Sequence, residues 1–111
     1  MGRNQNKKYT SYIQGSQITV ALRGEIDHHG ARDCIREIVS KIESYSPKVC
    51  VLDFQDVTFM DSSGIAVVIN ALRRMAQIEG RLCLQSIGAQ PMKVFRASGI
   101  DKIVEIKEAV K

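Results

Sequence analysis

The first third of the chain has a polar and apolar alternation that predicts a β-hairpin followed by a helix. Residues Tyr9 to Gln14 and Gln17 to Leu22 flank a Gly15-Ser16 turn, and alternate residues of the second run are apolar. A loop from Gly24 to Gly30 is expected next. The spacing then changes to that of an amphipathic helix. Its apolar positions are Ala31, Cys34, Ile35, Ile38, Val39 and Ile42.

The middle third predicts a buried strand and a long helix. The apolar run from Val49 to Leu52, followed by Asp53-Phe54, is typical of a strand covered on both faces. The helix is expected from Ser63 to Glu79, with Gly80 as its C-terminal signal. Its expected core stripe is Ile65, Val68, Ile69, Leu72 and Ala76, and a second apolar line is Val67, Ala71, Met75 and Ile78. A helix that is apolar on so many sides is either deeply buried or presents one line to a partner, and both interpretations stay open here.

The last third completes an alternation of strands and helices. Arg81 to Gln85 is a further strand, and a short helix is bracketed by Pro91 and Gly99. Ile103, Val104 and Ile106 indicate a last strand, and Lys107 to Lys111 can form no more than one helical turn. This order predicts an α/β fold with a mixed sheet, antiparallel at the opening hairpin and parallel where helices connect the strands.

Length and composition indicate one globular domain. The 111 residues are 44% hydrophobic and 25% charged, as in ordinary soluble domains. We expect residues 1–8 to form a basic N-terminal tail and residues 9–111 to form the single domain. No apolar stretch approaches the roughly 20 residues that span a bilayer, and no signal-peptide core is visible. We therefore expect a cytoplasmic protein that does not interact with a membrane.

The net charge of +4 comes from the first part of the chain. The first 24 residues contain Arg3, Lys7, Lys8 and Arg23 and no acid, and the remaining basic residues equal the 12 acidic residues in number. No strand rich in aromatic residues accompanies this basic segment. Direct binding to nucleic acid is therefore not expected.

Cysteine and histidine residues do not form a recognisable metal site. Cys34, Cys50 and Cys83 lie in apolar runs without C-x-x-C spacing, which favours buried free thiols. His28 and His29 are adjacent, so their side chains point in different directions, and no third ligand follows at metal spacing. We expect a histidine pair in a loop, and no metal.

The segment from Thr58 to Ile65 carries the candidate chemistry. Two hydroxyl groups, those of Ser62 and Ser63, lie where the buried strand gives way to the long helix. Asp61 or Ser62 can cap that helix by accepting hydrogen bonds from its first backbone N–H groups. A helix N-terminus also favours a phosphate group, so a serine here is a candidate for a switch. The alternative is a cap in a tight turn with no regulatory role.

Four segments together resemble a known family. They are Gly24-Glu25-Ile26-Asp27-His28-His29, the strand Val49 to Phe54, Phe59-Met60-Asp61-Ser62-Ser63-Gly64, and Phe95-Arg96-Ala97-Ser98-Gly99-Ile100. In this order and spacing the chain resembles the STAS domain of anti-sigma factor antagonists, above all the sporulation branch that antagonises an anti-sigma F factor. The likeness runs from about Ile18 to Ile106. It implies the STAS fold, a mixed sheet of four to five strands with three to four helices. The basic N-terminal extension and a short C-terminal helix depart from the family.

The resemblance implies a phosphorylation-controlled regulator of transcription that is not an enzyme and has no cofactor. In that family the unphosphorylated antagonist binds an anti-sigma factor that is itself a serine kinase, and thereby releases the sigma factor. Phosphorylation, here on Ser62, abolishes binding, and a metal-dependent serine phosphatase restores it. By position, the implied partner-binding residues are Gly24, Glu25, Asp27, His28, Asp61, Ser62, Ser63, Gly64 and Val67.

Other functions agree less well with the residues. A phospho-aspartate receiver with Asp53 as its acceptor needs a further acidic pair after the first strand to hold Mg²⁺, and Tyr9 to Arg23 contains no acid. An enzyme is disfavoured because no phosphate-binding glycine loop, catalytic triad or metal triad is present in the sequence. A STAS scaffold or interaction module, of the stressosome or transporter-associated kind, stays open as the alternative.

Overall fold

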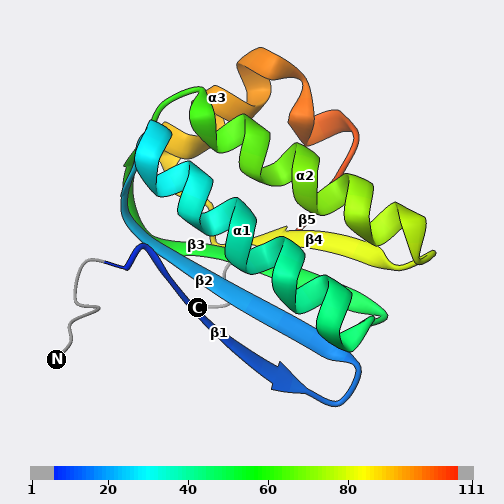
Figure 1. Ribbon diagram of the computed structural model, residues 1–111. Helices are drawn as coiled ribbons and strands as arrows, with labels where there is room; N and C mark the ends of the chain where they lie inside the picture. The colour runs from blue at the N-terminus through cyan, green and yellow to red at the C-terminus, as the bar shows by residue number, and fades with distance from the viewer. Residues whose placement is uncertain (1–6, 108–111) are drawn as a thin grey trace, which may run out of the picture.

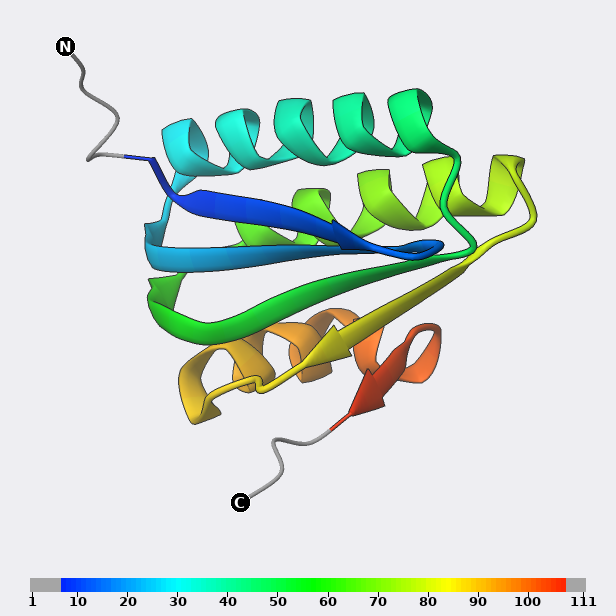
Figure 2. The same cartoon turned by 90° about the horizontal axis from the view of Figure 1, so that it is seen from below.

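Five strands lie side by side in one mixed sheet, in their order along the chain (Figures 1 and 2). The computed structural model describes residues 7–107. The strands are β1 (Tyr9–Gln14), β2 (Gln17–Ile26), β3 (Val49–Met60), β4 (Arg81–Gln85) and β5 (Glu105–Lys107). β1 is antiparallel to β2, and every other pair of neighbours is parallel. The predicted α/β class, with an antiparallel hairpin and parallel crossovers, is confirmed.

Three helices connect the parallel strands. They are α1 (His28–Tyr45), α2 (Ser63–Gln77) and α3 (Ala89–Ser98), and a 3₁₀ turn, η1 (Ile100–Lys102), follows α3. α1 and α2 lie next to each other over the sheet (Figure 1). One continuous core joins all three helices to alternate residues of the strands, among them Val20, Leu52, Leu84, Cys34, Val68 and Phe95. The sequential strand order differs from the 2-1-3-4-5 order of receiver domains, which argues against the receiver interpretation.

The opening hairpin is confirmed, but β2 and β3 are longer than predicted. Gly24 has a φ of +72° and lies where the β2–β3 register shifts. Gly24 pairs with Val57 and Glu25 with Phe59, so β3 carries the extra residue of a bulge, and pairing continues beyond it. The expected loop from Gly24 to Gly30 is therefore wrong. Residues 24–26 belong to β2, residues 28–30 open α1, and Asp27 alone joins the two elements. The inward positions of β2 still alternate from Leu22 through residue 24 to Ile26, but residue 24 is a glycine between the charged Arg23 and Glu25, so this stretch resembles a loop in sequence.

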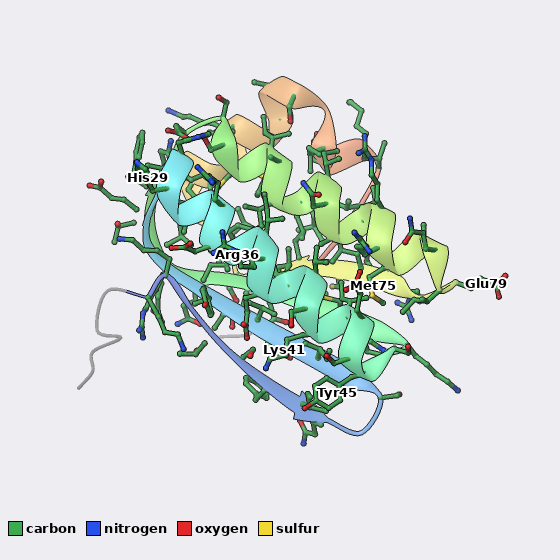
Figure 3. All side chains as sticks on the ribbon, viewed as in Figure 1. His29, Arg36, Lys41, Tyr45, Met75 and Glu79 are labelled. Carbon is green, nitrogen blue, oxygen red and sulfur yellow. The ribbon has the colours of Figure 1, made fainter. Side chains whose placement is uncertain are left out.

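The end of α2 also differs from the prediction. The left-handed residue is Glu79, with a φ of +59°, and not Gly80. A larger residue than Gly80 would not fit at this position, because a Cβ atom there would lie 2.4 Å from the Met75 Cε and 3.1 Å from the Lys48 carbonyl oxygen. Figure 3 labels Met75 on the last turn of α2 and Glu79 just beyond the end of the helix.

The two apolar lines of α2 have exchanged roles. Val67, Ala71 and Met75, for which the sequence left both burial and a docking face as interpretations, are buried in the core. Most of the expected core stripe is only partly covered: Ile65, Ile69 and Leu72 are half-buried and Ala76 is exposed. Burial is thus the correct interpretation of the second line, and that line offers no docking face except at its exposed end, Ile78.

The C-terminal part is shorter in regular structure than predicted. β4 has the predicted bounds, but Ile103 is exposed and β5 begins only at Glu105. The expected turn of helix from Lys107 lies outside the described residues, apart from Lys107 itself, which ends β5. Residues 1–6 of the expected tail also lie outside them. The carbonyl oxygens of Lys7 and Lys8 accept hydrogen bonds from Arg23, so contacts with the fold begin before Tyr9.

All three cysteines are buried free thiols, as predicted. Burial raises the pKa of Cys34 and of Cys50 to about 12, and it also raises the pKa of Cys83. Because the thiolate is the reactive form, none of these side chains has the character of a reactive cysteine.

Candidate functional site

The carboxyl ends of β2 and β3 bring the two predicted site segments together. Ile26 and Met60 are register partners at the end of the parallel pair, and the Asp61 N–H donates to the Ile26 carbonyl oxygen at 3.4 Å. Parallel strands that end at the same level deliver their following residues to one edge of the sheet. The start of α1 and the start of α2 therefore lie next to each other at this edge (Figure 1).

Asp61, and not Ser62, supplies the side-chain cap of α2. Its carboxylate oxygen Oδ1 accepts the Ser63 N–H at 2.8 Å, whereas the Ser62 side chain makes no capping hydrogen bond. The next two N–H groups, of Gly64 and Ile65, donate at 3.0 Å to the carbonyl oxygens of Asp61 and Ser62. The first donors of the helix are therefore already occupied, and the Ser62 hydroxyl is left outside this network.

The two serines of this turn are unequal. Ser62 is exposed and precedes the helix, whereas Ser63 is half-buried and is its first residue. This difference leaves Ser62 as the more accessible hydroxyl.

Close packing of Gly64 against the side chain of Met60 fixes the position of this turn. A Cβ atom on Gly64 would lie 2.6 Å from both the Sδ and the Cε of Met60, whose side chain is fully buried. Val67, one helical turn further along, is only 1% exposed. The structure therefore does not bring the side chain of Val67 to the surface beside Ser62, and Gly64 is also buried.

Gln90 of α3 holds the end of β3, and sequence reasoning missed it. Its Oε1 accepts the Met60 N–H at 2.9 Å, and its Nε2 donates to the Met60 carbonyl oxygen at 2.8 Å. The side-chain amide thus replaces a neighbouring strand at the residue that precedes Asp61. No local sequence pattern indicates a contact between residues 30 positions apart.

Replacing Gln90 by alanine is expected to destabilise the protein by about 1 to 3 kcal/mol, because the main-chain groups of Met60 lose both partners. The midpoint of urea unfolding measures this loss. Gln77→Ala is the matched control, since Gln77 is exposed at the end of α2; its unfolding midpoint should stay close to that of the unchanged protein. Equal midpoints for the two variants would contradict a structural role for the Gln90 amide.

Asp27 caps α1 at the same edge of the sheet. Its Oδ1 accepts the Gly30 N–H at 2.8 Å, and this hydrogen bond, with a smaller contribution from His29, lowers the pKa of the carboxyl group. A pKa below that of the unfolded chain means that the charged cap stabilises the fold at neutral pH, and that this contribution is lost as the pH falls through the folded-state pKa.

His28 and His29 are the first two residues of α1. The expectation that they lie in a loop is therefore wrong. Both are exposed, and their ring centroids are 6.0 Å apart (Figure 3 labels His29). Among residues 7–107, no three His, Cys, Asp or Glu side chains are grouped so as to hold a metal ion.

The resulting surface is acidic with one aromatic side chain. We call it the Ser62 surface and define it by six residues: Glu25, Asp27, His28, Phe59, Asp61 and Ser62. Phe59 is 47% exposed and is the register partner of Glu25. Its position two residues before Asp61 was the available signal, but a single apolar residue does not reveal from sequence that it faces solvent.

Comparisons with known proteins agree with this fold. The STAS domain family model matches residues 8–111. The anti-sigma F factor antagonist of Lysinibacillus sphaericus is 29% identical over 83 residues, which cover 75% of this chain and 71% of that protein. The anti-sigma-B factor antagonist of Listeria monocytogenes is 29% identical over 93 residues, covering 81% and 78%.

A solved structure gives the same result. The anti-sigma factor antagonist SpoIIAA in its unphosphorylated form superimposes with a TM-score of 0.82, at 25% identity over 93% of this chain and 89% of that one. Within residues 7–107, no helix has the length and apolar character needed to cross a bilayer. These matches place the chain in the STAS domain family, together with relatives that are named anti-sigma factor antagonists.

Proposed function

We propose that this chain is an anti-sigma factor antagonist that phosphorylation of Ser62 switches off. The observation that carries the proposal is the Ser62 hydroxyl, which is exposed beside α2 and makes no capping hydrogen bond. Phosphorylation of this oxygen breaks no contact that stabilises the turn. The names of the relatives supply the class of partner, and SpoIIAA has been solved in a phosphorylated form, with a TM-score of 0.74 to this chain.

The proposed switch acts by charge. A phosphoryl group adds about −1.5 to −2 charges at neutral pH. The Ser63 N–H already bonds to Asp61, so the new group finds no free donor there and extends toward solvent beside a carboxylate. A partner that covers the Ser62 surface would have to desolvate this charge, which opposes binding.

The partner proposed for the unphosphorylated form is an anti-sigma factor that is itself a serine kinase. Binding releases the sigma factor, the kinase phosphorylates Ser62 with ATP, and a metal-dependent serine phosphatase removes the phosphoryl group. In this scheme the chain is a binding protein and a kinase substrate, not an enzyme. It forms one STAS domain over residues 9–111 and acts in the cytoplasm, without contact to nucleic acid or membrane.

Incubation with the anti-sigma kinase and Mg-ATP is expected to add a single phosphoryl group, on Ser62. Peptide mass mapping measures the number and position of the groups, and Ser62→Ala should take up none. A label on Ser63, or two labels on one chain, would refute the assignment. A chain that no anti-sigma kinase binds or modifies would instead favour a STAS scaffold of the stressosome kind.

A further inference from the structure

The outer edge of β1 is an unprotected strand edge. β1 is the first strand of the sheet and pairs only with β2 among the described residues. Its six residues, Tyr-Thr-Ser-Tyr-Ile-Gln, contain no charge and no proline, and its pairing with β2 has no bulge. Charges, prolines and bulges are the usual devices that keep an edge strand from pairing with another chain. Tyr12 and Ile13 are moreover 56% and 41% exposed.

The hydrogen bonds of the hairpin show which main-chain groups are available. The Arg23 N–H donates to the Lys8 carbonyl oxygen at 2.9 Å, so Lys8 and Arg23 form a hydrogen-bonded pair of the ladder. Such pairs alternate along antiparallel strands. The N–H and C=O groups of Thr10, Tyr12 and Gln14 therefore face β2, and those of Tyr9, Ser11 and Ile13 face the outer edge.

We propose that this edge pairs with β1 of a second copy of the chain, antiparallel and centred on Ser11. This register is the one that pairs all three outward-facing residues: Tyr9 opposes Ile13 of the second copy, and Ser11 opposes Ser11. Each opposed pair exchanges two main-chain hydrogen bonds. On the face that α1 covers, Tyr9 opposes Ile13, an aromatic residue against a β-branched one. On the opposite face Thr10 opposes Tyr12, and such pairs stabilise sheets.

Charges on α1 favour the same register. α1 runs alongside β1 at this margin of the sheet (Figure 2), where the Ser11 hydroxyl donates to Glu37 at 2.9 Å and the Lys41 ammonium lies 3.6 Å from Glu37. A two-fold axis through Ser11 passes near Glu37 and makes the two α1 helices antiparallel. Asp33, one turn before Glu37, then opposes Lys41 of the second copy, one turn after it. Unlike charges thus meet twice, and the two Glu37 carboxylates near the axis each keep their own Ser11 and Lys41 as partners.

The paired form leaves the Ser62 surface free. That surface lies at the carboxyl ends of β2 and β3, and the two-fold axis directs these ends of the two copies in opposite directions. The proposal concerns self-association and does not depend on the proposed function.

Sedimentation velocity over a concentration series tests the pairing. The unchanged chain is expected to shift from monomer to dimer with concentration. Ser11→Pro removes the central outward N–H without removing a bond to β2, and should lower the association constant at least tenfold. Ser11→Ala is the matched control, because it loses the hydroxyl bond to Glu37 but keeps the N–H, and it should stay within about threefold of the unchanged chain, given the small contribution of an exposed hydrogen bond.

A charge exchange tests the register even if Ser11→Pro folds poorly. Asp33→Lys should weaken the dimer because two pairs of like charges then face each other, and adding Lys41→Glu to it should restore association. A chain that stays monomeric at its highest soluble concentration would overturn the proposal, and so would equal association of Ser11→Pro and Ser11→Ala. Capture of an extended peptide from another protein by a monomeric chain would assign the edge to that partner instead, and would equally overturn it.

Discussion

Ser62→Asp is expected to bind the anti-sigma factor at least tenfold more weakly than the unchanged chain, a loss of about 1.4 kcal/mol or more of binding free energy. The added carboxylate lies beside Asp61 on the Ser62 surface and must be desolvated in the complex. The fold should not change, because the Ser62 hydroxyl makes no capping bond and a helix N-terminus favours an anion by about 0.3 to 1 kcal/mol. Titration calorimetry measures binding, and circular dichroism with thermal melting measures the fold.

Ser40→Asp is the matched control for this charge. Ser40 is exposed on α1, about 18 Å along the helix from its first residues, which border the Ser62 surface. This variant should bind as tightly as the unchanged chain. If Ser62→Asp unfolded, phosphorylation would act by a change of conformation, and if it bound normally, Ser62 would have only a structural role in the turn.

The mixed character of the sheet and most elements follow from periodicity and turn chemistry. The Gly15-Ser16 turn and the run from Arg81 to Gln85 have local signals that tertiary contacts do not override, and both were predicted correctly. The continuation of β2 beyond Leu22 was not visible, because a glycine occupies the inward position between Leu22 and Ile26, where strand prediction depends on an apolar side chain. A left-handed glycine inside a strand has the same sequence appearance as a glycine in a loop.

The facing of α2 could not be decided from sequence for a different reason. Both of its apolar lines have helical spacing, so the pattern does not say which one contacts the sheet. The close approach of Gly64 to Met60 turns the line of Val67 and Met75 inward. That contact depends on where β3 ends, which is a tertiary property.

The candidate site was predicted as far as it is local. Asp61, Ser62 and Ser63 lie in one turn, and cap chemistry alone indicates that one of them ends the strand and another begins the helix. The Gln90 amide and the exposure of Phe59 depend on how α3 and the strand ends meet. Such long-range contacts leave no periodic signal in the sequence.

Phe95→Ala is expected to destabilise the protein by about 3 to 5 kcal/mol, the usual cost of removing a buried phenylalanine. The Phe95 ring is fully buried and packs edge-to-face on Phe54, with ring centroids 5.4 Å apart and planes at 86°. This pair joins α3 to β3 six residues before Met60, the strand end that the Gln90 side chain holds. Because a domain of this size is stable by only about 5 to 15 kcal/mol, a large part of its stability should be lost. Urea unfolding followed by circular dichroism measures the change.

Phe59→Ala removes the same kind of side chain, from the end of β3 and not from α3, and is expected to affect binding more than stability. The Phe59 ring is about half exposed on the Ser62 surface, so its loss should cost less than about 1 kcal/mol of stability, as for most surface substitutions. It should nevertheless weaken binding to the anti-sigma factor severalfold, because exposed aromatic side chains are frequent anchors of protein interfaces. Equal stability losses for the two variants would show that Phe59 belongs to the core. Unchanged binding of Phe59→Ala would show that the partner contacts Ser62 without covering the end of β3.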